Sequence, residues 1–266
     1  MTTSTPKPTM PENLERLEAH ERSMRGKSLA AINADVALLD HVNLVEAVMN
    51  HLDFFAKLPP KDLDQETVQL LGARVFNDLA SAYGQTTRGY HQIAAATLRD
   101  VMEVLFLLGW FDRDTAKIKE WRESDDATRR KIFAPVKVRE FLDNFDGFKE
   151  GKRGADYKMF CEYAAHATWQ GFALMRPTGG GKAIMGPFFD HGLLKAVLEE
   201  LAKLAAQIGN YFATFFPDKS DVPSLETELH RLEATSKWAE TYLGRKHDTA
   251  FLDEMKGYLA ALKGER

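Results

Sequence analysis

The stretch LAAINADVALLDHVNLVEAVMNHLDFFAKL, residues 29–58, carries the clearest structural signal in the chain. Its apolar residues recur every three or four positions, which places them on one face of an α-helix and predicts that this face packs against a core. Ser28 can cap the start of the helix, and the prolines at 59 and 60 stop it. The residues that define the buried face are Leu38, Val42, Val45 and Met49.

The same helical spacing continues through most of the chain. Asp62, followed three residues later by Gln65, resembles a capping box, and Pro135 should divide residues 125–145 into two short helices. Further helices are expected over residues 87–111 and 155–175, whereas runs of alternating β-branched residues are missing from the sequence. We therefore predict an all-α bundle of seven to nine helices with antiparallel neighbours. It would form one domain over residues 11–266, preceded by a disordered tail at residues 1–10.

Composition narrows the classes of function. The chain has 266 residues, a formal charge of −4 and one cysteine, Cys161. Weak net charge gives no general attraction to nucleic acid, and the longest apolar run, VLFLLGWF, is too short to cross a bilayer. The lone cysteine and the lack of a secretory signal at the start of the sequence favour the cytoplasm. We expect a soluble homodimer that does not act at a membrane.

One helix combines charged and apolar residues on a single stripe. In RGYHQIAAATLRDVMEVLFLLGWF, residues 88–111, a helical period aligns Arg88, Gln92, Arg99 and Glu103 and then continues into Phe106 and Trp110. Because the stripe becomes apolar after Glu103, we expect this face of the helix to become buried from about that residue onward. The Arg99–Glu103 ion pair should therefore be at least partly buried. It could line a polar pocket, although a solvated salt bridge is the simpler interpretation.

A second candidate lies in CEYAAHATWQGF, residues 161–172. On a continuous helix Glu162 and His166 would share a side, so the carboxylate could orient the imidazole for proton transfer. A histidine packed between helices explains the same pattern, and this interpretation is favoured. We expect Cys161 to be a small buried hydrophobic residue rather than a reactive thiol.

Other motifs fail specific tests. A carboxylate-bridged metal pair needs two Glu-x-x-His motifs, whereas Glu162 and His166 follow a different spacing that occurs once, so neither a metal nor a cofactor is expected. The segment RPTGGGKAIMG, residues 176–186, lacks the Ser or Thr that a phosphate-binding loop requires after Lys182. We expect it to be a surface loop that could fold over whatever His166 faces. The Arg-to-His spacing of helical toxin ribonucleases is also missing, so the sequence does not support action on nucleic acid.

Four segments resemble a bacterial all-helical family catalogued as a domain of unknown function. They are ATLRDVMEVLFLLGWF, KEWRES, APVKVREFL and YKMFCEYAAHAT, and the resemblance covers about residues 70–210. The resemblance implies a helical fold and no defined activity. It also implies that an Arg and a Glu on one helix act together with a Tyr and a His on a later one. The matching residues here are Arg99, Glu103, either Tyr157 or Tyr163, and His166.

Two main hypotheses follow, and whether the protein is an enzyme stays open. The first is a regulatory or interaction protein without a complete catalytic site. The second is a small-molecule or nucleotide-processing protein. In its pocket Arg99, Tyr163 and Glu162 would bind a small anionic ligand, and His166 and Glu103 would perform the chemistry. A weaker alternative is a defence protein that acts on nucleic acid.

Overall fold

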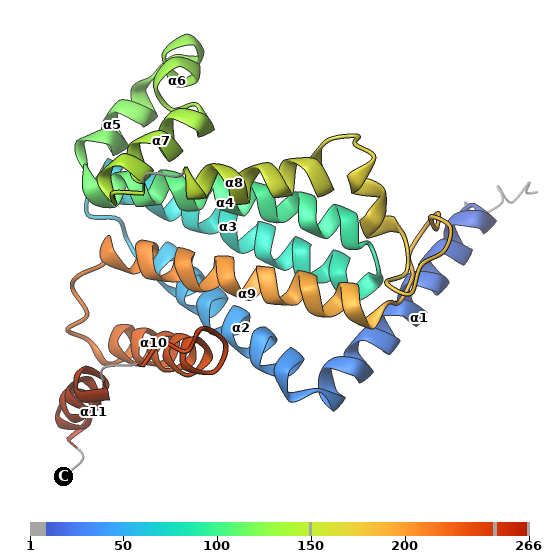
Figure 1. Ribbon diagram of the computed structural model, residues 1–266. Coiled ribbons are helices and arrows are strands. Elements are labelled where there is room, and N and C mark those ends of the chain that lie inside the picture. The colour runs from blue at the N-terminus through green and yellow to red at the C-terminus, as the bar shows by residue number, and fades with distance from the viewer. Residues whose placement is uncertain (1–8, 149–150, 247–248, 265–266) are drawn as a thin grey trace, which may run out of the picture.

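The computed structural model describes residues 9–148, 151–246 and 249–264, in which eleven α-helices and no strands occur (Figure 1). The all-α prediction is confirmed, but the expected number of seven to nine helices was too low. Most of the tail expected at residues 1–10 lies outside the described residues. The helices are α1 (Glu12–Ala34), α2 (Val36–Ala56), α3 (Leu63–Arg88), α4 (His91–Arg113), α5 (Ala116–Glu123), α6 (Asp126–Ile132), α7 (Pro135–Phe145), α8 (Lys152–Phe160), α9 (His191–Thr214), α10 (Val222–Leu243) and α11 (Thr249–Lys263).

The segment expected to form one helix over residues 29–58 is divided at Asp35. This residue has extended backbone angles, and its carboxylate accepts hydrogen bonds from the backbone N–H groups of Ala37 and Leu38, which caps α2. Ser28 therefore lies buried inside α1 and caps nothing. The break was not predicted, because an aspartate within an apolar repeat is equally compatible with the polar face of one continuous helix. The chain turns at Asp35, so α1 and α2 diverge from it (Figure 1).

The centre of the bundle is α9, which packs against α2, α3 and α4 (Figure 1). The apolar faces of these four helices form one continuous core. At the crossing of α3 and α9, Gly72 faces the ring of Phe212, and a Cβ atom at residue 72 would collide with that ring. The close approach of the two helices thus depends on glycine. The fully buried side chains Phe55, Phe111, Leu98 and Leu108 fill the space between the four helices.

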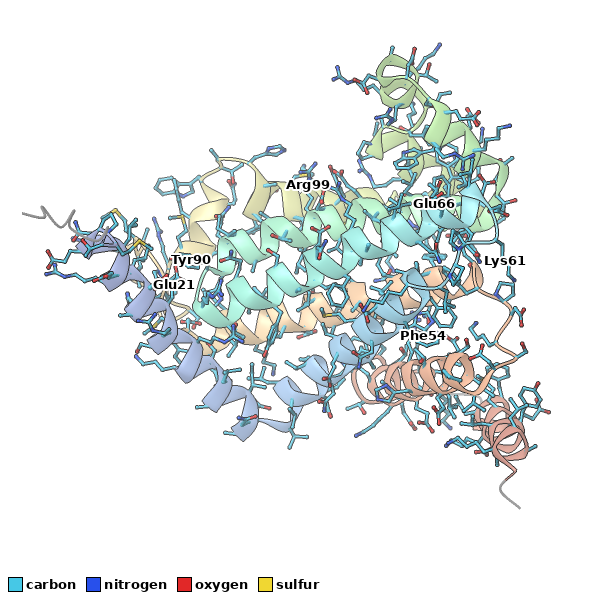
Figure 2. All side chains as sticks on the ribbon, turned by 180° about the vertical axis from the view of Figure 1, so that it is seen from behind. Glu21, Phe54, Lys61, Glu66, Tyr90 and Arg99 are labelled. Carbon is cyan, nitrogen blue, oxygen red and sulfur yellow. The ribbon has the colours of Figure 1, made fainter. Side chains whose placement is uncertain are left out.

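Helices α3 and α4 form an antiparallel hairpin through a tight turn at Gly89. Its positive φ of 91° and the nearby backbone of Phe188 both require glycine. The N-terminal helix α1 contacts this turn, because the Tyr90 hydroxyl donates a hydrogen bond to Glu21 Oε1 at 2.8 Å. Figure 2 shows these two residues side by side. Arg88, placed on the α4 stripe by the sequence, is the last residue of α3 and is exposed.

Three short helices, α5, α6 and α7, form an arm that projects from the bundle (Figure 1). Pro135 is the first residue of α7, which confirms the expected break between two short helices. Ile118 of α5 and Val138 and Leu142 of α7 are buried, whereas α6 has no buried residue. The arm is therefore held at its two ends, and α6 crosses between them.

Candidate functional site

The predicted Arg99–Glu103 pair forms on α4, and the hydroxyl of Tyr157 joins it. Arg99 Nη2 lies 2.5 Å from Glu103 Oε1, and the Tyr157 hydroxyl donates to the same oxygen at 2.5 Å. This hydroxyl also accepts from Arg99 Nε at 3.0 Å and from Nη2 at 2.8 Å. The Arg99 and Glu103 side chains are 32% and 27% exposed, so the pair is partly buried, as the stripe predicted. Figure 2 shows Arg99 where α4 runs alongside α8.

Tyr157 holds this network together rather than titrating within it. Burial, together with the Glu103 carboxylate, raises the pKa of Tyr157 to about 12, so the hydroxyl keeps its proton near neutral pH. The Arg139 guanidinium stacks on the tyrosine ring, with Cζ 3.9 Å from the ring centroid. Helices α4, α7 and α8 are thus linked through one side chain. Of the two tyrosines matched by the family resemblance, the structure joins Tyr157, not Tyr163, to Arg99 and Glu103.

The helix expected over residues 155–175 does not continue through His166. After α8 the backbone widens into a π-turn, η1 (Cys161–Ala165), and His166 follows in an extended conformation. Glu162 and His166 therefore do not share a helical face, which corrects the premise of the proposed carboxylate–imidazole pair. The His166 side chain is exposed rather than packed in the core, and Cys161 is only half-buried.

The structure does not bring His166 or Tyr163 into the Arg99 network. Tyr163 is 41% exposed and lies near a second short turn, η2 (Gln170–Met175), where Trp169 and Phe172 are also exposed. The π-turn η1, which precedes it, is nevertheless anchored to α4, because Gln92 Nε2 donates to the carbonyl oxygen of Ala164. The residues expected to form one pocket thus fall into two groups, an α4–α8 network and an exposed aromatic turn.

The glycine-containing loop at residues 176–190 is ordered over the α3–α4 turn. Thr178 donates its backbone N–H to Asp190 Oδ2 at 2.8 Å, and Phe188 donates its own to the Gly89 carbonyl oxygen at 3.2 Å. Beneath it, His91 Nε2 lies 3.3 Å from the Phe188 carbonyl oxygen. The glycines at 179–181 stand in open space. The loop therefore covers the start of α4, and its first residue, Arg176, lies over the exposed Trp169 ring, with Cζ 5.7 Å from the ring centroid.

A cleft of about 610 Å³ opens beside the Arg99 network, between the α3–α4 hairpin and the arm. Its size is in the range of pockets that hold organic ligands of drug size. Glu103 belongs to both the network and the cleft wall. Leu70 remains 66% exposed there, so part of the apolar wall is open to solvent. The apolar residues that line the cleft include Leu70, Leu71, Val104 and Leu107 of the hairpin and Trp121, Phe133 and Val138 of the arm.

Charged side chains lie at both ends of this cleft. At one end Arg74 Nη2 lies 2.5 Å from Asp100 Oδ2, next to Glu103. At the other end Arg122 Nη1 lies 2.5 Å from Asp64 Oδ1 and 3.2 Å from the Thr67 hydroxyl. Helical spacing could not predict this arrangement, because its parts come from three separate segments of the chain. The available signal was the helical spacing of Asp100, Glu103 and Leu107, which places them on one face of α4.

Asp78 makes the Arg74 end of the cleft sensitive to pH. Burial, and secondly the charge of Asp100, raises the pKa of Asp78 to about 6. Since the ordinary value is 3.8, folding favours the protonated form. The resulting stabilisation is present below about pH 4 and is lost as the pH rises through about 6.

We expect Asp78→Asn to remove this pH dependence. Between about pH 4.5 and about pH 7.5 the wild-type chain should lose stability relative to the variant, because only the wild type gains a buried charge beside Asp100. Urea unfolding of both proteins at the two pH values measures the difference. Parallel pH profiles for the two proteins would show that Asp78 titrates normally.

A second buried network lies on the other side of the bundle and was not predicted. His51 Nε2 is 2.7 Å from Glu228 Oε2, and Arg231 Nη2 is 2.7 Å from Glu228 Oε1. Arg231 also donates to Asn210 Oδ1 at 2.7 Å. Although burial opposes ionisation, the hydrogen bonds from His51 and Arg231 hold the pKa of Glu228 at about 2. This network joins α2, α9 and α10. Its three charged side chains line neither of the two clefts between α2 and α10, so we interpret it as a structural element.

Comparison with known proteins adds no functional information. No family model, curated protein or solved structure matches the chain. Within the described ranges, no group of three His, Cys, Asp or Glu side chains is placed to hold a metal ion. Over the same part of the chain, no helix is both long and apolar enough to span a bilayer. The family resemblance, the homodimer and the cytoplasmic location remain predictions.

Proposed function

We propose that the protein binds a small organic molecule in the cleft between the α3–α4 hairpin and the arm, and that it acts as a regulatory protein rather than an enzyme. The observation that carries this proposal is the cleft itself, whose walls are mainly apolar and whose four charged side chains are each engaged in an ion pair. Such a distribution is typical of ligand sites, in which apolar walls supply affinity and a few polar groups orient the ligand.

The polar groups of the cleft support binding better than catalysis. Arg74 is paired with Asp100, Arg122 with Asp64, and Glu103 with Arg99 and Tyr157. A general base or acid should have a pKa near the working pH and be free to exchange its proton with the substrate. Each of these carboxylates already lies 2.5 Å from an arginine side chain, so it would have to leave that ion pair before it could contact a substrate as a base. His166, the proposed proton carrier, does not line this cleft.

The position of the arm would couple ligand binding to regulation. Trp121 of α5 and Val138 of α7 line the cleft, so a ligand would contact both ends of the arm and the hairpin together. It would bury apolar surface that is open in its absence, including Leu70, and this burial favours one position of the arm. Partner molecules would then recognise the arm in that position through the exposed surface of α6.

The proposal is tested with N-phenyl-1-naphthylamine, an uncharged probe whose fluorescence rises in apolar surroundings. Wild-type protein should bind it saturably. Leu70→Glu should weaken binding by at least about tenfold, because it replaces part of the apolar wall with a charge. Leu70 is already 66% exposed, so this substitution should not impair folding.

Leu63→Glu is the matched control. Leu63 lies on the same helix and is 62% exposed, but it does not line the cleft. The control should bind the probe as the wild type does. Failure of the wild type to bind, or an equal loss in both variants, would exclude the cleft as the binding site.

A further inference from the structure

The charged groups of the cleft also restrict the ligand. Those in its lining are Arg74, Asp100, Glu103 and Arg122, two positive and two negative. Each one lies 2.5 Å from an oppositely charged protein group: Arg74 and Asp100 pair with one another, Glu103 with Arg99, and Arg122 with Asp64. The four charges of the lining are therefore paired before any ligand enters, and Asp78, 3.9 Å from Arg74 and outside the lining, is a further carboxylate beside the same arginine. A ligand brings its charge into a cleft whose own charges are already neutralised.

A charged ligand would lose its hydration on entering the cleft and would find no unpaired charged group in the lining to compensate for that loss. Its ion would lie against apolar walls made by Leu71, Val104 and Phe133, or it would have to displace one side of an existing ion pair. A hydroxyl or carbonyl group faces a smaller cost. It can share a hydrogen bond with Arg74 or Asp100, whose side chains are 57% and 35% exposed, without separating the pair.

The spacing of the two charged ends sets the length of the apolar part. Thr67, which contacts Arg122, and Arg74, which contacts Asp100, are both on α3. Seven residues of helix span about 10 Å, and Leu70 and Leu71 lie between the two ends. An apolar body of about this length, such as two fused aromatic rings with a short chain, would fill the middle of the cleft.

From these observations, and resting on the proposed function, we infer that the ligand is an uncharged amphipathic molecule. It has an aromatic or aliphatic body about 10 Å long and a hydroxyl or carbonyl group at the end beside Arg74 and Asp100. This inference replaces the small anionic ligand expected from the sequence, because Arg99 is already engaged by Glu103 and Tyr157.

The test compares three compounds that share one naphthalene body: 2-(1-naphthyl)ethanol, 2-(1-naphthyl)ethylamine and 1-naphthylacetate. Each competes with N-phenyl-1-naphthylamine for the full-length protein near neutral pH. The alcohol should displace the probe at a concentration at least about tenfold lower than the amine or the acid. Equal or better displacement by either charged compound would overturn the inference.

An Arg74→Met variant is expected to shift the preference of the cleft from the alcohol toward the amine. It leaves Asp100 without its partner at the cleft, so the amine should gain at least about tenfold relative to the alcohol. Arg22→Met, on the exposed face of α1, is the control and should leave the order unchanged. An unchanged order in Arg74→Met would contradict the inferred position of the polar group. If the wild type binds the probe but favours a charged compound, only this inference fails; if it does not bind the probe, the proposed function fails as well.

Discussion

Replacing Glu228 with alanine is expected to lower the free energy of unfolding by about 3–5 kcal/mol. Glu228 is only 5% exposed, and its carboxylate lies against both the Arg231 guanidinium and the His51 imidazole. Its removal would leave the Arg231 guanidinium buried, with only the neutral Asn210 oxygen as a partner. His51, whose pKa burial already lowers, would lose the carboxylate beside its Nε2 atom. Chemical denaturation of the wild type and the variant measures the loss.

Glu226→Ala provides the control on the same helix. The Glu226 side chain is 47% exposed, and its ion pair with Lys263 lies on the surface, so its loss should cost less than about 1 kcal/mol. The pH dependence is a second readout. Since the pKa of Glu228 is lowered from 4.5 to about 2, its stabilisation is present above about pH 4.5 and is lost as the pH falls toward 2. Equal losses in Glu228→Ala and Glu226→Ala would contradict the buried network.

Replacing Phe212 with alanine should cost a similar amount, about 3–5 kcal/mol, through a different mechanism. The Phe212 side chain is fully buried, and its ring lies 4.8 Å from that of Phe216 and 5.8 Å from that of His51. Because its edge also contacts the backbone at Gly72, neighbouring side chains cannot easily fill the space it leaves. Thermal and urea unfolding both report the loss.

The control for Phe212 is Phe251→Ala on α11. Phe251 is 52% exposed, so its removal creates no internal cavity and should change stability by less than about 1 kcal/mol. A small effect of Phe212→Ala would mean that α3 and α9 close over the missing ring. If the space instead stays open, Gly72→Ala, which collides with the native ring, should be tolerated in the Phe212→Ala background.

The fold was predictable to the extent that local signals determine it. Helical spacing identified nearly all the helices, Asp62 caps α3 as expected through the backbone N–H of Gln65, and Pro135 starts α7. The break at Asp35 was missed because aspartate fits both the polar side of a helix and a cap. The sequence also offers Asp248 as a cap for the last helix, and this residue lies outside the described residues.

The candidate site was predictable only where its residues share one helix. Arg99 and Glu103 are four residues apart, so their ion pair follows from the helical repeat. Their partner Tyr157 comes from a helix more than fifty residues later, and helical spacing alone could not choose it over Tyr163. His166 was misplaced because a π-turn changes the direction of the side chains that follow it.

Occupancy of the cleft is the central claim, and methyl-labelled NMR spectra of the protein with N-phenyl-1-naphthylamine test it most directly. Chemical-shift changes should concentrate on Leu71, Val104, Leu107 and Val138, which line the cleft from the hairpin and the arm. The probe protons should also show nuclear Overhauser effects to these methyl groups. The claim would be contradicted if the changes instead concentrated on Leu174 and Met175, which belong to η2, and left the four cleft methyl groups unaffected.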